Sequence, residues 1–116
     1  RFDNRDFAAT ADFDLFIKAV DYARTNDIPI KAGNILTNDQ FYKDDMDSYK
    51  KWAEFGVLCV EMEAAGLYTI AAKFGVQALA ILTISDSLVT GEATSSSERE
   101  TSFSQMIEIA LNVATE

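Results

Sequence analysis

The sequence predicts an α/β fold with a mixed, mainly parallel central sheet flanked by helices. Two observations carry this prediction. Short apolar runs alternate with segments whose apolar residues recur at helical spacing, and the order along the chain is strand, helix, strand, helix. Such an order is typical of βαβ units, in which helices cover parallel strands. No repeat, low-complexity tract or Pro/Gly linker divides the 116 residues, so we expect residues 1–116 to form a single domain.

The first third of the chain predicts a helix and then a strand. Helical spacing indicates an amphipathic helix over residues 12–25, through Phe13, Phe16, Ile17, Val20 and Ala23. Asn26-Asp27 ends this helix, and residues 28–36 alternate enough to predict a strand. Pro29 lies near the start of that strand, where a missing backbone donor matters least.

The rest of the chain predicts three more helices and two more strands. A polar segment, 44–51, leads into a short helix through Trp52 and Phe55, with Gly56 as a left-handed cap. The apolar runs 57–60 and 78–84 predict strands, the first of them covered on both faces. The helix between them ends at Gly75 and has its apolar positions at Ala64, Leu67, Tyr68, Ala71 and Ala72. The last helix follows a Thr- and Ser-rich loop and is predicted from Phe103, Met106, Ile107, Ala110 and Leu111.

Composition excludes several classes of partner and chemistry. With 19 acidic and 10 basic residues the net charge is −9, which argues against nucleic acid or an anionic membrane as partner. No apolar stretch approaches the roughly 20 residues of a membrane span. Cys59 is the single cysteine, so we interpret it as a small core residue in a reducing cytoplasm. The absence of histidine removes the usual general base and the commonest metal ligand.

Acidic residues follow both apolar strands of the second half. Glu61 and Glu63 come after the first, and Ser85-Asp86 after the second. Ligands of open α/β sheets bind beyond the carboxyl ends of the strands, so these side chains could face one crevice. Glu63 could there accept hydrogen bonds from two vicinal hydroxyls. The alternative is that Glu61 and Glu63 only charge the N-terminus of the following helix, where the macrodipole favours anions.

A cation in the last helix offers a partner for Asp86. Ser95 and Glu98 have the spacing of a capping box, which places Arg99 in the first helical turn. A cation there opposes the macrodipole and is stabilised by an acidic partner. Asp86 is the candidate; the alternative is a solvated Arg99 with a structural Asp86.

Four ordered stretches of the sequence are informative together: residues 6–13, 34–42 and 60–68, and the region from Ser85-Asp86 to Glu98-Arg99. They resemble bacterial purine nucleoside phosphorylases of the hexameric type, in the nucleoside phosphorylase-I superfamily. Residues 60–68 (VEMEAAGLY) are similar to the ribose-binding segment of that family. A second stretch resembles the catalytic loop and helix of that family. It consists of Ser85-Asp86 followed by Thr90, Glu92, Thr94 and Glu98-Arg99. Residues 6–13 (DFAATADF) and 34–42 (NILTNDQFY) are similar as well. The resemblance runs through essentially the whole chain and implies the C-terminal half of a phosphorylase domain, with the fold of that superfamily.

The resemblance implies reversible phosphorolysis of purine nucleosides to free base and ribose 1-phosphate, as in purine salvage. Glu63 would bind the ribose 2′- and 3′-hydroxyls, with Met62 packing beneath the sugar and Glu61 in the same segment. Asp86 would protonate the purine N7, and Arg99 would stabilise the carboxylate that Asp86 becomes. The remaining contacts implied are Phe41 and Val60 beside the purine ring and Ser85 next to Asp86. No metal or organic cofactor is implied, and inorganic phosphate is a co-substrate.

The family pattern also predicts what this chain lacks. The family's phosphate-binding glycine and arginine residues belong to an N-terminal half, so we expect no phosphorolysis from this segment without it. The family borrows a histidine from a neighbouring subunit, whereas this sequence has none, and Ser87 and Gly91 depart from the usual residues near the acid. The resemblance implies a cytoplasmic homohexamer, a trimer of dimers. A half-sheet exposes an edge and a face, so we expect aggregation or association with the other half.

Two alternatives to the phosphorylase stay open. A methylthioadenosine-type nucleosidase shares the Met62-Glu63 and Ser85-Asp86 pattern but uses water, although Arg99 and the Phe41-Tyr42 pair favour the phosphorylase. The second alternative is a nucleoside-binding fragment without turnover. A purely structural role fits poorly with acidic residues at both buried strand ends. An acid that contacts N7 serves adenosine, inosine and guanosine alike, so the expected substrates are purine nucleosides as a class.

Overall fold

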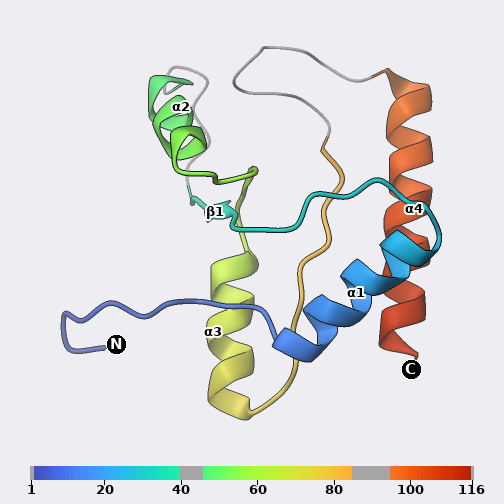
Figure 1. Cartoon of the computed structure of the whole chain (residues 1–116). Helices are drawn as coiled ribbons and strands as arrows, with labels where there is room; N and C mark the ends of the chain where they lie inside the picture. Colours follow the sequence, from blue (N-terminus) through green and yellow to red (C-terminus); the bar gives the residue numbers. More distant parts are fainter. Residues whose placement is uncertain (1, 40–45, 85–94, 116) are drawn as a thin grey trace.

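The fold consists of four helices and one small sheet over the residues that the computed structural model describes, 2–39, 46–84 and 95–115. Figure 1 shows the arrangement. In chain order the elements are α1 (Phe13–Thr25), β1 (Leu36–Thr37), α2 (Met46–Glu54), β2 (Val60–Glu61), α3 (Ala64–Phe74) and α4 (Ser96–Ala114). The mixture of helices with a parallel sheet agrees with the α/β class. The predicted sheet is much wider than the two strands seen in the described ranges.

The predicted ends of α1 are confirmed. The Asp12 carboxylate accepts a hydrogen bond from the Leu15 N–H at 3.0 Å, which caps the helix N-terminus. The Asp12 N–H in turn donates to the Ala78 carbonyl at 2.9 Å, so the cap also fixes where the chain passes after α3. Asn26 is the C-cap, and Asp27 follows with a positive φ of 54°.

The sheet pairs the segment before Asp39 with the segment before α3. β1 and β2 run parallel, with Leu36 opposite Val60 and Thr37 opposite Glu61. Backbone hydrogen bonds extend the contact to both sides, from the Leu58 N–H to Asn34 O and from the Asn38 N–H to Glu61 O, each 2.9 Å. The two strands therefore end side by side, and their carboxyl ends meet at one edge.

Two of the three predicted strands are shorter in the described part of the structure, and the third is absent there. Residues 28–35 and 57–59 fall outside the ladder, and residues 78–84 form no strand, because a strand requires a neighbouring backbone. Segment 78–84 instead lies between α3 and α4 (Figure 1), where the Ala80 N–H donates to the Tyr68 hydroxyl at 2.8 Å. The predicted coverage of segment 57–60 on both faces is also wrong, since Leu58 is exposed.

Glycine ends two of the helices where the sequence predicts it. After α2, Gly56 has a φ of 82°, and after α3, Gly75 has a φ of 65°, both in the left-handed region that glycine adopts without strain. The short helix begins at Met46, inside the predicted polar segment, and ends at Glu54, before Phe55. Its start is earlier than predicted because the polar residues 47–51 are themselves helical.

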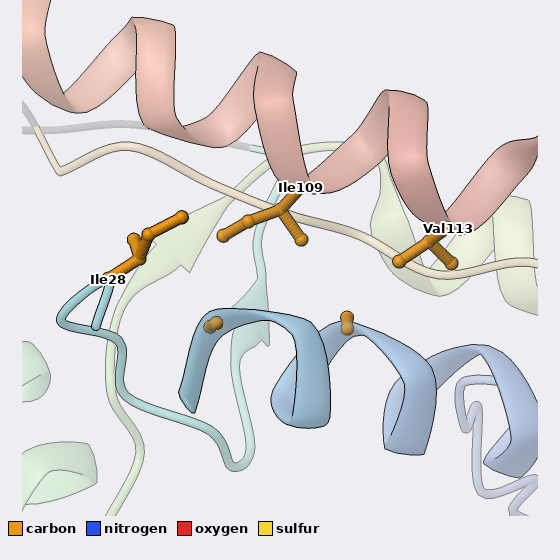
Figure 2. Packing of buried hydrophobic residues seen from close by; sticks show 5 residues of the cluster. Ile28, Ile109 and Val113 are labelled. Atoms are coloured by element: carbon orange, nitrogen blue, oxygen red, sulfur yellow. The ribbon is translucent and has the colours of Figure 1, made fainter. Parts of the chain in front are cut away.

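The buried core lies between α1 and α4. It consists of Ala19, Ala23, Ile28, Ile109 and Val113. Figure 2 shows Ile28 and Ile109 directed toward each other and Val113 directed toward α1. Ala23 is 0% exposed, so its small side chain allows the two helices to approach closely.

The predicted packing faces of these two helices are partly wrong. On α4, Ile109 and Val113 face the core, whereas Phe103, Ile107 and Leu111 are exposed. On α1, Phe13 is 72% exposed although the apolar spacing placed it on the buried face. Both helices carry apolar side chains on more than one face, and the contact between them covers only one.

Loss of the Ile109 side chain should destabilise the fold measurably. Ile109 is 3% exposed in the core cluster, so Ile109→Ala leaves a cavity and lowers the free energy of unfolding by about 2–4 kcal/mol. Urea denaturation measures the change. Leu111→Ala is the matched control on the same helix, since Leu111 is 60% exposed and its removal should cost under about 1 kcal/mol. Equal losses for the two variants would contradict the packing described here.

Candidate functional site

An open hollow lies where β1 and β2 end and α3 begins. Parallel strands present their carboxyl ends at the same sheet edge, and the first turns of α3 form the adjoining wall. The lining combines polar residues from the strand ends with apolar residues from the helix. They are Thr37, Asn38, Asp39, Met62, Glu63, Ala65, Gly66, Leu67 and Ile70. Segments 34–39 and 60–68, predicted separately from the sequence, thus come together here.

Glu63 stands at the N-cap position of α3 without capping it. Its φ and ψ are −130° and −20°, and its side chain makes no capping hydrogen bond. The residue is exposed and lines the hollow together with Met62. A carboxylate in this position offers two acceptor oxygens to a ligand with neighbouring hydroxyls.

Glu61 behaves differently, because its carboxylate is turned toward the helix. It accepts hydrogen bonds from the backbone N–H of Glu63 at 2.6 Å and of Ala64 at 2.7 Å. Its other oxygen accepts from the Thr37 hydroxyl. The alternative in which an acidic residue charges the helix N-terminus is therefore confirmed for Glu61. Contact between Glu61 and a ligand stays a prediction.

These contacts set the ionisation of Glu61. Partial burial raises the pKa of the carboxyl, but the hydrogen bonds from Thr37 and from the backbone N–H groups of Glu63, Ala64 and Met62 outweigh burial and lower it. A carboxyl with a lowered pKa stabilises the folded state above its unfolded pKa, and this contribution is lost as pH falls through the folded pKa. Glu61 is therefore ionised at neutral pH.

Of the other predicted site residues, Val60 and Arg99 belong to the described part of the chain, and the remaining three do not. Val60 is half-buried in β2, opposite Leu36, and does not line the hollow. Arg99 is exposed in the first turn of α4, as predicted, and the Ser95 hydroxyl caps that helix by accepting from the Glu98 N–H at 3.1 Å. Phe41, Ser85 and Asp86 lie outside the described residues, so their contacts with the purine and with Arg99 stay predictions.

The sequence interpretation missed Thr37. Its hydroxyl contacts the Glu61 carboxylate and accepts a hydrogen bond from the Ala65 N–H at 3.0 Å. One signal was present, since Thr37 ends its strand just as Glu61 ends the neighbouring one. That signal becomes readable only once the register of the two strands is known.

A second, apolar cavity of about 490 Å³ is lined by segments 28–35 and 79–84 and by the helices α1 and α4. Cys59 lines it as a half-buried free thiol and does not belong to the buried core cluster, so its interpretation as a core residue is not confirmed. Burial, and secondarily the negative charge of Glu61, raises the pKa of the Cys59 thiol. A thiol with a raised pKa is a poor nucleophile at neutral pH.

Two further findings concern metals and membranes. In the described ranges, no three or more Cys, Asp or Glu side chains gather in a way that could hold a metal ion. None of the helices described combines the length and the apolar character that crossing a bilayer requires.

Comparisons with known proteins identify the family to which this chain belongs. The chain belongs to the phosphorylase superfamily, whose family model matches residues 3–116. Among curated proteins it is similar to those named purine nucleoside phosphorylase DeoD-type. It is 57% identical to the protein of Clostridium novyi (strain NT) over 114 residues, covering 98% of this chain and 49% of the relative. It is 60% identical over 114 residues to that of Thermoanaerobacter pseudethanolicus, with the same two shares covered.

Coverage is similar for a third relative. The protein of Exiguobacterium sp. (strain ATCC BAA-1283 / AT1b) is 57% identical over 116 residues, which is 100% of this chain and 49% of that protein. The chain thus spans about half the length of the curated relatives it matches. That the matched half is the C-terminal one stays a prediction of the sequence.

Proposed function

We propose that the protein containing this chain is a purine nucleoside phosphorylase, which converts a purine ribo- or deoxyribonucleoside and inorganic phosphate reversibly to the free base and the sugar 1-phosphate. One observation carries the proposal. Identity of 57–60% extends over at least 98% of the chain in relatives that bear this name. The hollow is compatible with it, because an acidic wall next to apolar side chains suits a neutral, hydroxyl-bearing sugar better than an anion.

In this proposal the sugar lies against the start of α3. Glu63 accepts hydrogen bonds from the 2′- and 3′-hydroxyls, and Met62 packs beneath the ring. Support comes from the position of both residues on the wall of the hollow and from the absence of a capping hydrogen bond to the Glu63 side chain. Phe41 and Val60 are assigned to the purine ring.

Bond cleavage is assigned to the acid and the cation. As the glycosidic bond breaks, its electron pair moves into the purine, and Asp86, beside Ser85, gives a proton to N7. A phosphate oxygen forms the new bond to the sugar C1′. Arg99 stabilises the Asp86 carboxylate that results, and its place in the first turn of α4 is compatible with this role. Charge opposite to a carboxylate favours its ionised form.

The whole protein supplies what the chain does not. We assign the phosphate-binding residues to the other half of the relatives' length, and no metal or organic cofactor to the reaction. We also propose that segments 28–35 and 78–84 become strands of a wider, mainly parallel central sheet when that half is present, within a single domain. Assembly in the cytoplasm as a homohexamer, a trimer of dimers, completes the proposal.

The test is phosphate-dependent release of hypoxanthine from inosine by the full-length protein. We expect turnover that rises with phosphate concentration and yields ribose 1-phosphate, since phosphate is the nucleophile. Turnover that continues undiminished in phosphate-free buffer, with ribose as product, would replace the phosphorylase by a nucleosidase. Saturable inosine binding without turnover would leave a nucleoside-binding protein.

A further inference from the structure

We propose that Thr37 is a positioning residue for Glu63: it takes over the capping of α3 together with Glu61, so that the Glu63 carboxylate is directed to the hollow instead of to the helix. The inference deepens the proposed function and rests on it for the identity of the ligand. Thr37 contributes through Glu63 and is not assigned a catalytic step.

The contacts form a closed network across the two strand ends and the helix. The Thr37 hydroxyl donates to one oxygen of Glu61 and accepts from the Ala65 N–H at 3.0 Å. The second oxygen of Glu61 accepts from the N–H groups of Glu63 at 2.6 Å and Ala64 at 2.7 Å. Three consecutive backbone donors at the start of α3 are thus satisfied by two side chains from the strands.

This arrangement changes what the N-cap residue has to do. A helix begins with N–H groups that lack partners within the helix, and an oxygen-bearing side chain near the N-cap ordinarily accepts from the second or third of them. Here Thr37 already accepts from Ala65, the second residue of α3. Glu63 is therefore relieved of capping, in agreement with the absence of a capping bond to its side chain.

The role requires a group that donates and accepts at once. A hydroxyl does both, whereas a methyl group does neither. Serine preserves the hydroxyl, and valine preserves the branched shape without it. In Thr37→Val the Ala65 N–H loses the hydroxyl that it bonds to in the wild type, and we expect the Glu63 carboxylate to move toward it. Glu63 would then turn from the hollow to the helix.

The experiment compares Thr37→Val and Thr37→Ser in the full-length protein, with Thr69→Val as matched control. Thr69 lies on the same helix, and its hydroxyl donates to the Ala65 carbonyl of the preceding turn. For Thr37→Val we expect the KM for inosine to rise about tenfold, with a smaller change in kcat, because sugar binding weakens. Thr37→Ser and Thr69→Val should stay within about twofold of the wild type.

A second readout does not depend on turnover. Hydrogen–deuterium exchange of peptides that contain the Ala65 amide should become about tenfold faster when Thr37→Val is added to Glu63→Ala, where no Glu63 carboxylate can replace the hydroxyl. Adding Thr37→Ser or Thr69→Val to Glu63→Ala should leave this exchange unchanged. Unchanged exchange on adding Thr37→Val overturns the network, and so does failure of serine to restore the KM. If the wild type shows no nucleoside turnover while exchange follows the expected pattern, the proposed function fails and the capping network stands.

Discussion

Asp86→Asn in the full-length protein is expected to reduce kcat for inosine at least about a hundredfold, because asparagine has no carboxyl proton to transfer to the departing purine. Asp86 lies outside the described residues, so the expectation rests on the family resemblance of the segment around it. The measurement is steady-state phosphorolysis at saturating phosphate. The KM for inosine should change much less than kcat, since the lost interaction belongs to the transition state.

A comparison of two substrates tests whether Asp86 acts by protonating N7. A purine nucleoside that is already methylated at N7 cannot be protonated there, so Asp86→Asn should cost it far less activity than it costs inosine. Asp47→Asn is a matched control, because Asp47 is an exposed residue of α2 that pairs only loosely with Lys50, at 4.0 Å. An equal loss with inosine and with the methylated nucleoside would argue against Asp86 as the proton donor.

Glu63→Gln is expected to raise the KM for inosine by roughly 10- to 100-fold, which corresponds to the loss of a hydrogen bond to a charged group. Glutamine keeps the shape of the side chain but loses the charge and one of the two acceptor oxygens. Kinetics with inosine at varied concentration measure the change. Glu63 is exposed on the wall of the hollow, so the substitution should leave the fold intact.

A nucleoside without the 2′- and 3′-hydroxyls tests whether Glu63 contacts these groups. A 2′,3′-dideoxynucleoside offers nothing for Glu63 to accept, so the wild type and Glu63→Gln should bind it equally. Glu54→Gln, at the exposed end of α2, is the matched control and should not alter the KM for inosine. If Glu63→Gln bound inosine as tightly as the wild type, the sugar would have to lie elsewhere.

The helices and most of their ends, the start of α2 excepted, could be predicted because their signals are local. Asp12 and Ser95 cap α1 and α4 with hydrogen bonds to residues three positions ahead, and Gly75 ends α3 by its own conformational freedom. The extent of the strands could not be predicted in the same way. Segment 78–84 has the apolar composition of a buried strand, but a strand forms only where another backbone supplies the hydrogen bonds.

Which face of a helix is buried depends on its neighbours and not on its own periodicity. On α4 the positions of Phe103 and Leu111 fit a helical stripe as well as those of Ile109 and Val113 do. Only the contact with α1 selects the second stripe.

The roles of the two acidic residues of the site also depend on their neighbours in the fold and could not be predicted from sequence position. Glu61 and Glu63 follow the same strand two residues apart, and their sequence positions favour either capping or ligand binding for both. The structure separates them, because β2 carries Glu61 beside Thr37 while Glu63 begins the helix. The role of Thr37 depends on strand register, which has no local signature in the sequence.

The contact between α1 and α4 also determines when α1 can pack during synthesis of the chain. The Tyr22 hydroxyl donates to the Glu108 carboxylate at 2.8 Å across 86 residues of chain, and the core cluster is closed by Ile109 and Val113. At ribosomal rates, α1 therefore waits roughly 4–17 s with its apolar face open before its partner is translated. Contacts between such distant segments also form slowly. We expect the exposed apolar face of α1 to favour aggregation of the nascent chain during this interval, and a chaperone that shields α1 would act there.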